Sequence, residues 1–198
     1  TDDIQLGRGE LVKDTARVLG RMTHGCIIRT YAQQDVEDFA YYSQIPTVNA
    51  LTDQEHPCQI LTDLFTIQER FGTVHGKVIA FVGDGASNIS NSWAFAAGKM
   101  DFELRVAAPE EFQLSDEVVE KAKGKILRTT DPLEAVEGAD VLYTDTWVSM
   151  GKEEEEARRL SLLKGYQINR TLLDKAGERA IVLHCLPAYR GKEISEEV

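Results

Sequence analysis

The chain has 198 residues, enough for one sizeable α/β domain or two small ones, and its apolar fraction of 42% is ordinary for a globular protein. The net charge of −11 argues against a broad nucleic-acid-binding face, which needs a basic surface. An anionic substrate therefore has to be held by local Arg side chains and helix N-termini, against the field of the whole chain.

Cysteine usage and hydropathy indicate where such a chain works. The three cysteines include no Cys-x-x-Cys pair, which fits a reducing compartment better than a disulfide framework. The longest apolar run, residues 78–82, is far too short to span a membrane, and no signal peptide is visible. We therefore expect a cytoplasmic protein with no membrane or nucleic-acid partner.

The first predicted elements are few and short. A helix is predicted over residues 10–22, a buried strand over 26–30, a helix capped by Asp35 up to residue 43, and a second strand over 47–49. Two helices and two strands cannot bury an independent core, so we expect this part to be the remainder of a larger domain. The chain also starts at Thr1 without Met and ends on Ser195-Glu196-Glu197, residue types that begin a helix, so both ends are predicted to be cut from something longer.

A helix that begins at Pro57 is predicted to bridge two units. Proline suits the first helical position, where its missing N–H costs nothing. His56 then lies at the positive end of the helix dipole, a place that attracts an anion. The predicted apolar stripe of this helix consists of Ile60, Leu61, Leu64, Phe65, Ile67 and Phe71.

After this helix the pattern becomes a regular alternation of strands and helices. Strands are predicted over residues 78–82, 103–107, 126–128, 141–144 and 180–183, and helices over 90–99, 115–123, 131–136, 152–163 and 169–175. Short apolar strands between helices predict a parallel sheet covered on both faces. The expected fold is α/β: two units with parallel sheets flanked by helices, the second doubly wound and Rossmann-like. Functional residues are then expected at the carboxyl ends of the strands.

The first polar strand end is Gly83-Asp84-Gly85. A Gly-rich turn between strand and helix can hold a nucleotide phosphate, but the third glycine of the dinucleotide fingerprint is absent. Nor does an acidic residue close the next strand. A tight turn that needs glycine for a positive φ is the alternative, and the spacing favours it.

Two further strand ends carry Asp145 and the pair His184-Cys185. Asp145 either binds a cationic substrate group or caps the following helix. A buried Cys is usually a small hydrophobe, but beside a histidine at a strand end Cys185 is also a candidate nucleophile, base or ligand. A zinc site of His56, Cys58, His184 and Cys185 is an alternative that the spacing disfavours, since it matches no common zinc pattern.

A series of short stretches runs from end to end of the chain. It comprises residues 3–10, 14–19, 28–30, 56–59, 83–85 with Asn88, 145–147 with 149–151, and 184–187 with 190–191. In order and spacing this series resembles the ornithine carbamoyltransferases of the aspartate/ornithine carbamoyltransferase family. The loop Ser149-Met150-Gly151 resembles the ornithine-binding type, and differs from that of aspartate- or putrescine-specific relatives.

The resemblance implies transfer of the carbamoyl group of carbamoyl phosphate to the δ-amine of ornithine, which gives citrulline and phosphate. It implies no metal and no organic cofactor, and a homotrimer or a multiple of one. It divides the chain into the remainder of a carbamoyl phosphate-binding domain (1–55), the bridging helix (56–72) and an ornithine-binding domain (73–198). The family's phosphate-binding Ser-Thr-Arg-Thr loop and a late Arg-bearing helix have no counterpart in this sequence.

The resemblance also assigns roles to individual residues. The catalytic candidates are Arg29, His56 and Cys185. The carbamoyl phosphate-binding candidates are Gln5 (in a neighbouring subunit's site), Arg29, His56, Gln59, Cys185 and Leu186. The ornithine-binding candidates are Asn88, Asp145, Ser149 and Met150.

Three rival functions stay open at the level of sequence. One is a dinucleotide-binding oxidoreductase on the same sheet. Another is a non-catalytic relative that keeps the fold. The third is a carbamoyltransferase for another amine, such as putrescine or N-acetylornithine.

Overall fold

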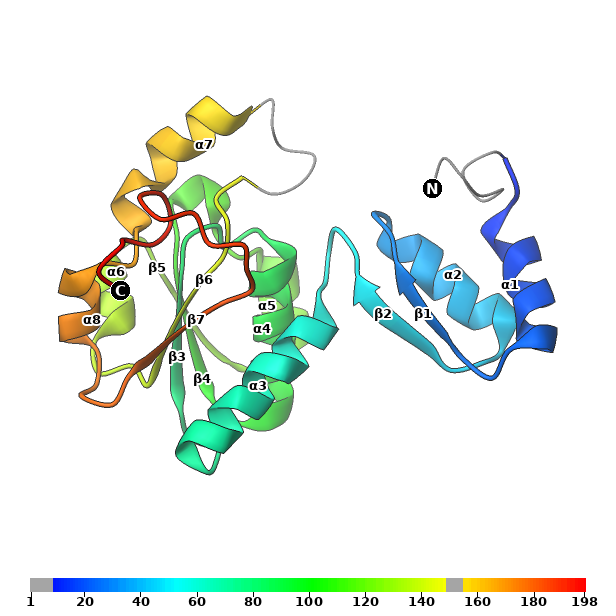
Figure 1. Ribbon diagram of the computed structural model, residues 1–198, viewed down its shortest axis with the longest axis horizontal. Coiled ribbons are helices and arrows are strands. Elements are labelled where there is room, and N and C mark those ends of the chain that lie inside the picture. Colours follow the sequence, from blue (N-terminus) through cyan, green and yellow to red (C-terminus); the bar gives the residue numbers. More distant parts are fainter. Residues whose placement is uncertain (1–8, 149–154) are drawn as a thin grey trace. The chain divides into compact units, whose positions relative to one another are not determined.

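The computed structural model describes residues 9–148 and 155–198 (Figure 1). The chain divides into two compact units, unit 1 (Thr1–Cys58) and unit 2 (Gln59–Val198). No helix within the described ranges is long and apolar enough to cross a membrane.

Unit 1 is a small βαβ arrangement with one additional helix. Its elements are α1 (Val12–Met22), β1 (Cys26–Arg29), α2 (Gln33–Ser43) and β2 (Thr47–Leu51). The two strands are parallel, with Cys26 opposite Thr47. Helices α1 and α2 approach closely at Gly20, where a Cβ atom would come within 2.2 Å of the Ser43 carbonyl oxygen.

The expected cap of α2 is wrong. The helix begins at Gln33 after Ala32, which makes no side-chain capping bond, and Asp35 lies inside its first turn. There the carboxylate accepts a hydrogen bond from the Thr30 hydroxyl at 3.4 Å. Asp35 still favours the helix, because a negative charge in the first turn complements the dipole.

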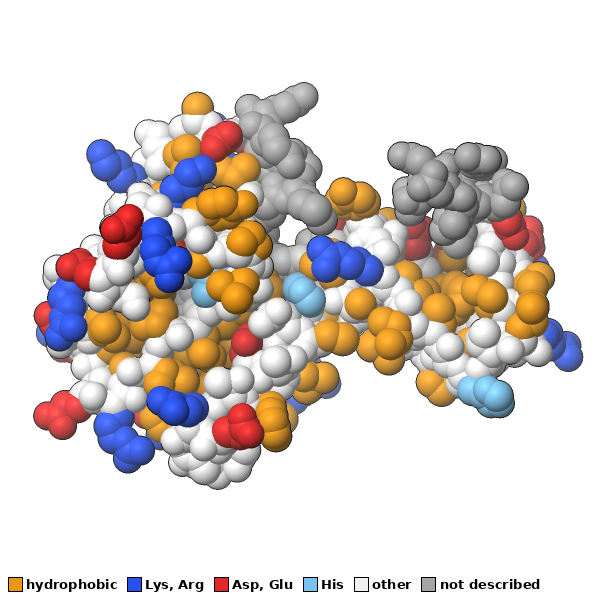
Figure 2. All heavy atoms as spheres, in the orientation of Figure 1, with side chains coloured by type: hydrophobic (Ala, Val, Ile, Leu, Met, Phe, Trp, Pro, Cys, Tyr) orange, Lys and Arg blue, Asp and Glu red, His pale blue; other side chains and the backbone are white. Residues whose placement is uncertain are grey.

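The apolar core of unit 1 is thin. Among its described residues, the buried apolar side chains are Ala16, Val36 and Phe39. Apolar side chains (orange) are seen on the face of this unit that Figure 2 shows. Several of its larger apolar side chains are exposed. They are Leu11, Val18, Met22, Ile27, Tyr31, Tyr41 and Val48.

Helix α3 (Pro57–Phe71) begins at the predicted proline, but its buried face differs from the predicted stripe. Ile60, Leu64 and Ile67 are buried as expected, and so is the carboxylate of Asp63. Leu61 and Phe65 are instead 65% and 63% exposed. They lie one residue beyond the buried positions, about 100° further around the helix, and so form a second apolar face.

Unit 2 is a five-stranded parallel sheet in the order β5-β4-β3-β6-β7. Its elements after α3 are β3 (Val78–Val82), α4 (Asn88–Met100), β4 (Glu103–Ala107), η2 (Glu110–Phe112), α5 (Asp116–Ala122), β5 (Lys125–Thr129), α6 (Pro132–Val136), β6 (Val141–Thr144), α7 (Glu156–Leu163), η4 (Lys164–Tyr166), α8 (Arg170–Lys175) and β7 (Ile181–His184). The chain runs outward from β3 to β5 and then returns to place β6 on the other side of β3. The expected α/β, doubly wound fold is therefore confirmed, and the winding reverses between β3 and β6.

Helices cover both faces of this sheet (Figure 1). On one face, α3, α4 and α5 pack over a core that centres on the fully buried Trp93. Its indole meets the rings of Phe102 and Tyr143 edge-on, with centroids 5.8 and 5.2 Å apart. On the other face, α6 and α8 cover a second core that includes Val136 and Leu172. This two-sided burial explains the nearly continuous apolar character of the strands.

Local capping signals in unit 2 agree with the structure. Asp131 caps α6 by accepting a hydrogen bond from the Leu133 N–H at 2.9 Å, with Pro132 at the first helical position. Asn169 caps α8 in the same manner. The acidic run predicted to open α7 lies partly outside the described residues, and the described helix begins at Glu156.

We expect Gly98→Ala to destabilise unit 2 by about 2 kcal/mol, the usual cost of overpacking a close contact. A Cβ atom at this position of α4 would lie 1.8 Å from the Ala122 carbonyl oxygen of α5, so the two helices would have to separate. The measurement is urea unfolding of both forms. Gly165→Ala is the control, since nothing lies within 4 Å of its Cβ position. Equal stability of the two variants would contradict this account of the α4–α5 contact.

Candidate active site

Three polar strand ends meet at one edge of the unit 2 sheet. Residues Phe81 of β3 and Tyr143 of β6 are paired, and so are Thr144 of β6 and His184 of β7. The Thr144 hydroxyl also donates a hydrogen bond to the Val82 carbonyl at 2.7 Å. The segments that follow these strands therefore lie side by side, as the sequence predicted.

The register of β6 and β7 brings Asp145 and Cys185 together. The Cys185 thiol donates a hydrogen bond to Oδ1 of Asp145 at 2.9 Å, and the Thr146 N–H donates to the same oxygen at 2.6 Å. Burial raises the pKa of Asp145, and these two bonds act in the opposite direction. The helix-cap interpretation of Asp145 is wrong, because the next described helix, α7, begins only at Glu156.

Cys185 is a neutral donor at this site. Its burial raises the pKa of the thiol, and the Asp145 charge and hydrogen bond raise it further. The thiolate is the form that acts as nucleophile or metal ligand, so this environment disfavours both roles. Within residues 9–148 and 155–198, no three His, Cys, Asp or Glu side chains are placed to hold a metal ion.

A second buried carboxylate, Asp63 of α3, lies in the same unit. The Tyr143 hydroxyl donates to its Oδ2 at 2.8 Å. The Gln59 side-chain amide donates to Oδ1 and Oδ2 at 3.1 and 3.2 Å. Burial raises the pKa of Asp63, whereas the bonds from Tyr143 and Gln59 lower it. These two donors partly compensate the cost of placing a charge on the buried face of the helix.

His184 supports the loop that carries Cys185 and Leu186. The Leu186 N–H donates to His184 Nδ1 at 2.8 Å, so this nitrogen is the acceptor and Nε2 carries the proton. Nε2 then donates to Oε1 of the fully buried Glu193 at 3.1 Å. The backbone N–H of Leu186 is therefore occupied by the His184 side chain.

The Gly83-Asp84-Gly85 turn is filled by protein atoms. Gly83 has φ of +141°, and a Cβ atom on Gly85 would lie 2.8 Å from the Phe112 carbonyl oxygen. The buried carboxylate of Asp84 pairs with the buried guanidinium of Arg159, whose Nε donates to the Trp147 carbonyl at 2.7 Å. The positive-φ interpretation is therefore confirmed for Gly83, whereas Gly85 is required by the close approach of Phe112 and not by its φ.

In unit 1, Arg29 ends β1 and His56 directly precedes α3. Burial lowers the pKa of His56, and the positive charge of Arg29 lowers it further. The imidazole is therefore neutral near pH 7 and suited to donate a hydrogen bond rather than to supply charge. The first turn of α3 is tied to β2 where the Cys58 thiol donates to the Asn49 carbonyl at 3.4 Å.

The remaining predicted site residues divide into two groups. Asn88 takes the first position of α4, directly after its cap Ser87. Gln5, Ser149 and Met150 lie outside the described residues.

Sequence reasoning missed the polar partners inside unit 2. The position of Asp63 could have been recognised from the sequence, since an acid at helical spacing between Ile60 and Ile67 interrupts an apolar face. Nothing in the sequence marks Arg159 and Glu193 as buried, because each lies among other charged residues.

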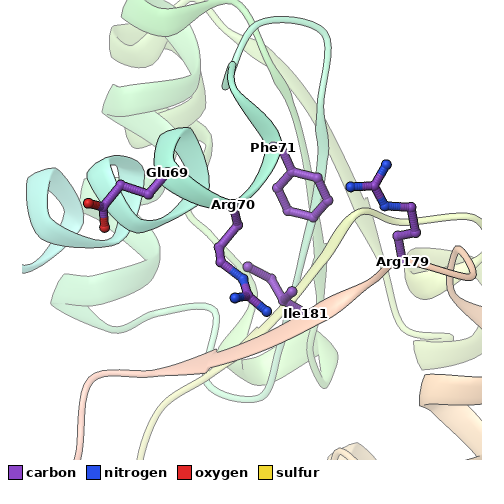
Figure 3. A pocket seen from close by; sticks show the side chains of 5 residues that line it. All are labelled: Glu69, Arg70, Phe71, Arg179 and Ile181. Atoms are coloured by element: carbon purple, nitrogen blue, oxygen red, sulfur yellow. The ribbon is translucent and has the colours of Figure 1, made fainter.

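A cavity of about 330 Å³ lies elsewhere in unit 2 (Figure 3). It is lined by Glu69, Arg70, Phe71, Arg179 and Ile181. Ile181 is the first residue of β7, so the cavity lies at the amino ends of the strands, opposite the candidate site. Substrate sites of open α/β sheets lie at the carboxyl ends, and this cavity is therefore not the candidate active site.

A doubly wound unit with convergent polar groups at the switch in strand order belongs to the class of α/β proteins that bind small molecules there. Residues 75–198 match the model of a family described as aspartate/ornithine carbamoyltransferase, Asp/Orn binding domain. Residues 1–69 match the carbamoyl-P binding domain of the same family. The chain belongs to the aspartate/ornithine carbamoyltransferase family.

Individual relatives are similar over nearly the whole chain. The ornithine carbamoyltransferase of Akkermansia muciniphila is 56% identical, over 99% of this chain and 65% of the relative. The anabolic ornithine carbamoyltransferase of Pseudomonas aeruginosa is 48% identical, over 99% and 64%. The crystal structure of the anabolic enzyme from Campylobacter jejuni has a TM-score of 0.92 at 42% identity, over 99% of this chain and 67% of that one. This chain thus spans just under two thirds of the length of the two curated relatives.

The contact between Asp145 and Cys185 predicts a measurable difference in thiol reactivity. Alkylation by iodoacetamide at pH 8 is expected to be about tenfold or more slower at Cys185 than at Cys26, since only the thiolate reacts. Asp145→Asn removes the charge that raises the pKa of Cys185 and keeps the size of the side chain, so alkylation of Cys185 should accelerate. Peptide mass spectrometry gives both rates, with Cys26 as the internal reference. Unchanged Cys185 reactivity in the variant would contradict the assigned contact.

Proposed function

We propose that the protein transfers the carbamoyl group of carbamoyl phosphate to the δ-amine of L-ornithine, which gives L-citrulline and phosphate. The observation that carries this proposal is the buried Asp145–Cys185 pair at the carboxyl ends of β6 and β7, in the unit that matches an Asp/Orn binding domain. The names of the relatives support it, and the absence of a dinucleotide fingerprint in the turn after β3 disfavours the oxidoreductase alternative.

Asp145 is proposed to bind the α-ammonium group of ornithine. Both bonds that the described residues donate to its carboxylate end on Oδ1, which leaves Oδ2 to accept from a cation. Asn88, Ser149 and Met150 are proposed to hold the rest of the amino acid. The Cys185 thiol and the Leu186 carbonyl are proposed to lie beside the δ-amine and the carbamoyl group.

Carbamoyl phosphate is proposed to be held by donors rather than by a metal. In unit 1, Arg29 and the neutral His56 donate to the carbonyl oxygen, where negative charge develops in the transition state. In unit 2, Gln59 orients the carbamoyl amide, and Gln5 is proposed to serve a neighbouring subunit's site. No cofactor is required for this chemistry.

The proposed reaction is a direct acyl transfer. The neutral δ-amine attacks the carbonyl carbon and forms a tetrahedral intermediate, and the bond from that carbon to the phosphate oxygen then breaks. Phosphate leaves with the bonding electron pair and takes up the one proton that the nitrogen gives up. Fixing two substrates in contact removes much of the entropic part of the barrier.

We also propose the organisation and setting of the protein. Residues 1–55 form part of a carbamoyl phosphate-binding domain, 56–72 the bridging helix and 73–198 the ornithine-binding domain. The first family match ends at residue 69, within this helix, and the second begins at residue 75, shortly after it. A homotrimer or a multiple of one, located in the cytoplasm and acting in arginine biosynthesis, is proposed from the resemblance and from the anabolic relatives.

A citrulline assay on the polypeptide that carries these residues, at its natural length, tests the proposal. Ornithine, putrescine and N-acetylornithine are supplied separately with carbamoyl phosphate, and product is expected with ornithine alone. Product with another amine instead would favour a carbamoyltransferase of different specificity. No product with any amine would favour a non-catalytic relative, and stabilisation by NAD against heat would favour the oxidoreductase.

Asp145→Asn is expected to raise the KM for ornithine by about 10- to 100-fold, as loss of a hydrogen bond to a charged group costs about 1.5–3 kcal/mol. The KM for carbamoyl phosphate should change little. Steady-state titration of each substrate gives both values. Asp174→Asn, which removes an exposed acid from α8, is the control. An unaltered ornithine KM in Asp145→Asn would overturn the assigned role.

A further inference from the structure

The side chain of Gln59 has a defined orientation. Gln59 lies in the first turns of α3, four residues before Asp63, so both side chains lie on the same face of the helix. Its Nε2 donates to both carboxylate oxygens of Asp63, at 3.1 and 3.2 Å. An ionised carboxylate only accepts hydrogen bonds, so the amide nitrogen must face Asp63 and Oε1 must face the other way.

Asp63 is itself held by the centre of the sheet. The Tyr143 hydroxyl of β6 donates to its Oδ2 at 2.8 Å. The fully buried Tyr143 ring stacks on Phe81, with centroids 6.0 Å apart, and meets Trp93 edge-on at 5.2 Å. These contacts hold the ring in a close-packed core with its hydroxyl directed at Asp63, so a continuous series of contacts runs from the core through Asp63 to Gln59.

A purely structural role does not explain the whole arrangement. One hydrogen bond from Tyr143 would suffice to tie α3 to the sheet, and an apolar residue at position 63 would continue the buried face of Ile60 and Ile67 without the cost of a buried charge. The additional feature is that both carboxylate oxygens accept from Gln59. The charge therefore selects one of the two possible orientations of that amide.

We propose that Asp63 and Tyr143 are positioning residues that present Oε1 of Gln59 as an acceptor for the N–H groups of a carbamoyl ligand. This inference rests on the proposed function and adds the basis of its selectivity. Carbamoyl phosphate carries an NH₂ group that donates to Oε1. Acetyl phosphate carries a methyl group at the same place and donates nothing, so the fixed amide discriminates between the two.

Asp63→Asn removes the constraint, because the new amide can donate to Oε1 of Gln59 and let it turn its own NH₂ group toward the ligand. Affinity for carbamoyl phosphate is expected to fall about tenfold or more. The NH₂ group of the ligand then faces the NH₂ group of Gln59, so one hydrogen bond is lost and two donors are opposed. Affinity for acetyl phosphate is expected to stay within about twofold, since it makes no such bond. Calorimetry with each ligand gives the two affinities and their ratio.

Tyr143→Phe is the second variant. It deletes one oxygen, keeps the ring packing and leaves Asp63 in place, so a smaller loss in the same direction is expected. Glu69→Gln is the matched control, because it removes a carboxylate from an exposed position of the same helix. Thermal unfolding is measured for all forms, and Tyr143→Phe carries the comparison if Asp63→Asn does not fold.

The outcomes distinguish two claims, the proposed reaction and the positioning role of Asp63 and Tyr143. A selective loss of carbamoyl phosphate affinity supports the positioning role, whereas an equal loss of both ligands or an unchanged ratio overturns it. If the unmodified protein forms citrulline and the ratio is unchanged in the variants, only this inference fails. If it forms none but Asp63→Asn loses the discrimination, the proposed reaction fails and the positioning role holds. Failure of the unmodified protein to bind either ligand overturns both.

Discussion

Parallel pairing of β3, β6 and β7 is the constraint on which the candidate site depends. All three strands run in one direction, so their carboxyl ends meet at one edge of the sheet, where the winding reverses. The register pairs Thr144 with His184, and the next residue of each strand, Asp145 or Cys185, then lies beside the other. A shift of one residue would turn one of these side chains to the opposite face. The same register keeps Tyr143 directed toward Asp63 of α3.

Burial decides the kind of chemistry that these groups can perform. It raises the pKa of Cys185 and lowers that of His56, so both are neutral near pH 7. Neutral donors suit a reaction in which a carbonyl oxygen gains charge only in the transition state. Buried carboxylates serve a different purpose: each one accepts bonds from particular donors and fixes their direction, as Asp63 does for Gln59 and Glu193 for His184. The site is thus built from oriented hydrogen bonds, which favours positioning over nucleophilic catalysis.

The predictions that succeeded rest on local physics. Alternating apolar strands and helices predicted the parallel sheet. The start of α3 follows from Pro57, and the start of α6 follows from its cap Asp131 and from Pro132. The failures share a cause, which is that residue type alone does not fix a position. Asp35 has the chemistry of a cap but lies inside α2, and Leu61 has that of a core residue but is exposed. Helix α2 begins two residues before Asp35, at Gln33. The core under the sheet takes up the face of α3 that carries Ile60 and Ile67 and not the face of Leu61.

The sequence by itself determined the element types, the doubly wound class and the family, because periodicity, turn chemistry and motif order are all properties of neighbouring residues. Only the tertiary structure decided which polar groups meet. Tyr143 and Asp63 are 80 residues apart, and Arg159 and Asp84 are 75 apart. Such bonds depend on strand order, register and the rotation of α3 about its axis. None of these is encoded in a local pattern, so the orientation of Gln59 and the hydrogen-bond partners of His184 became visible only in the folded chain.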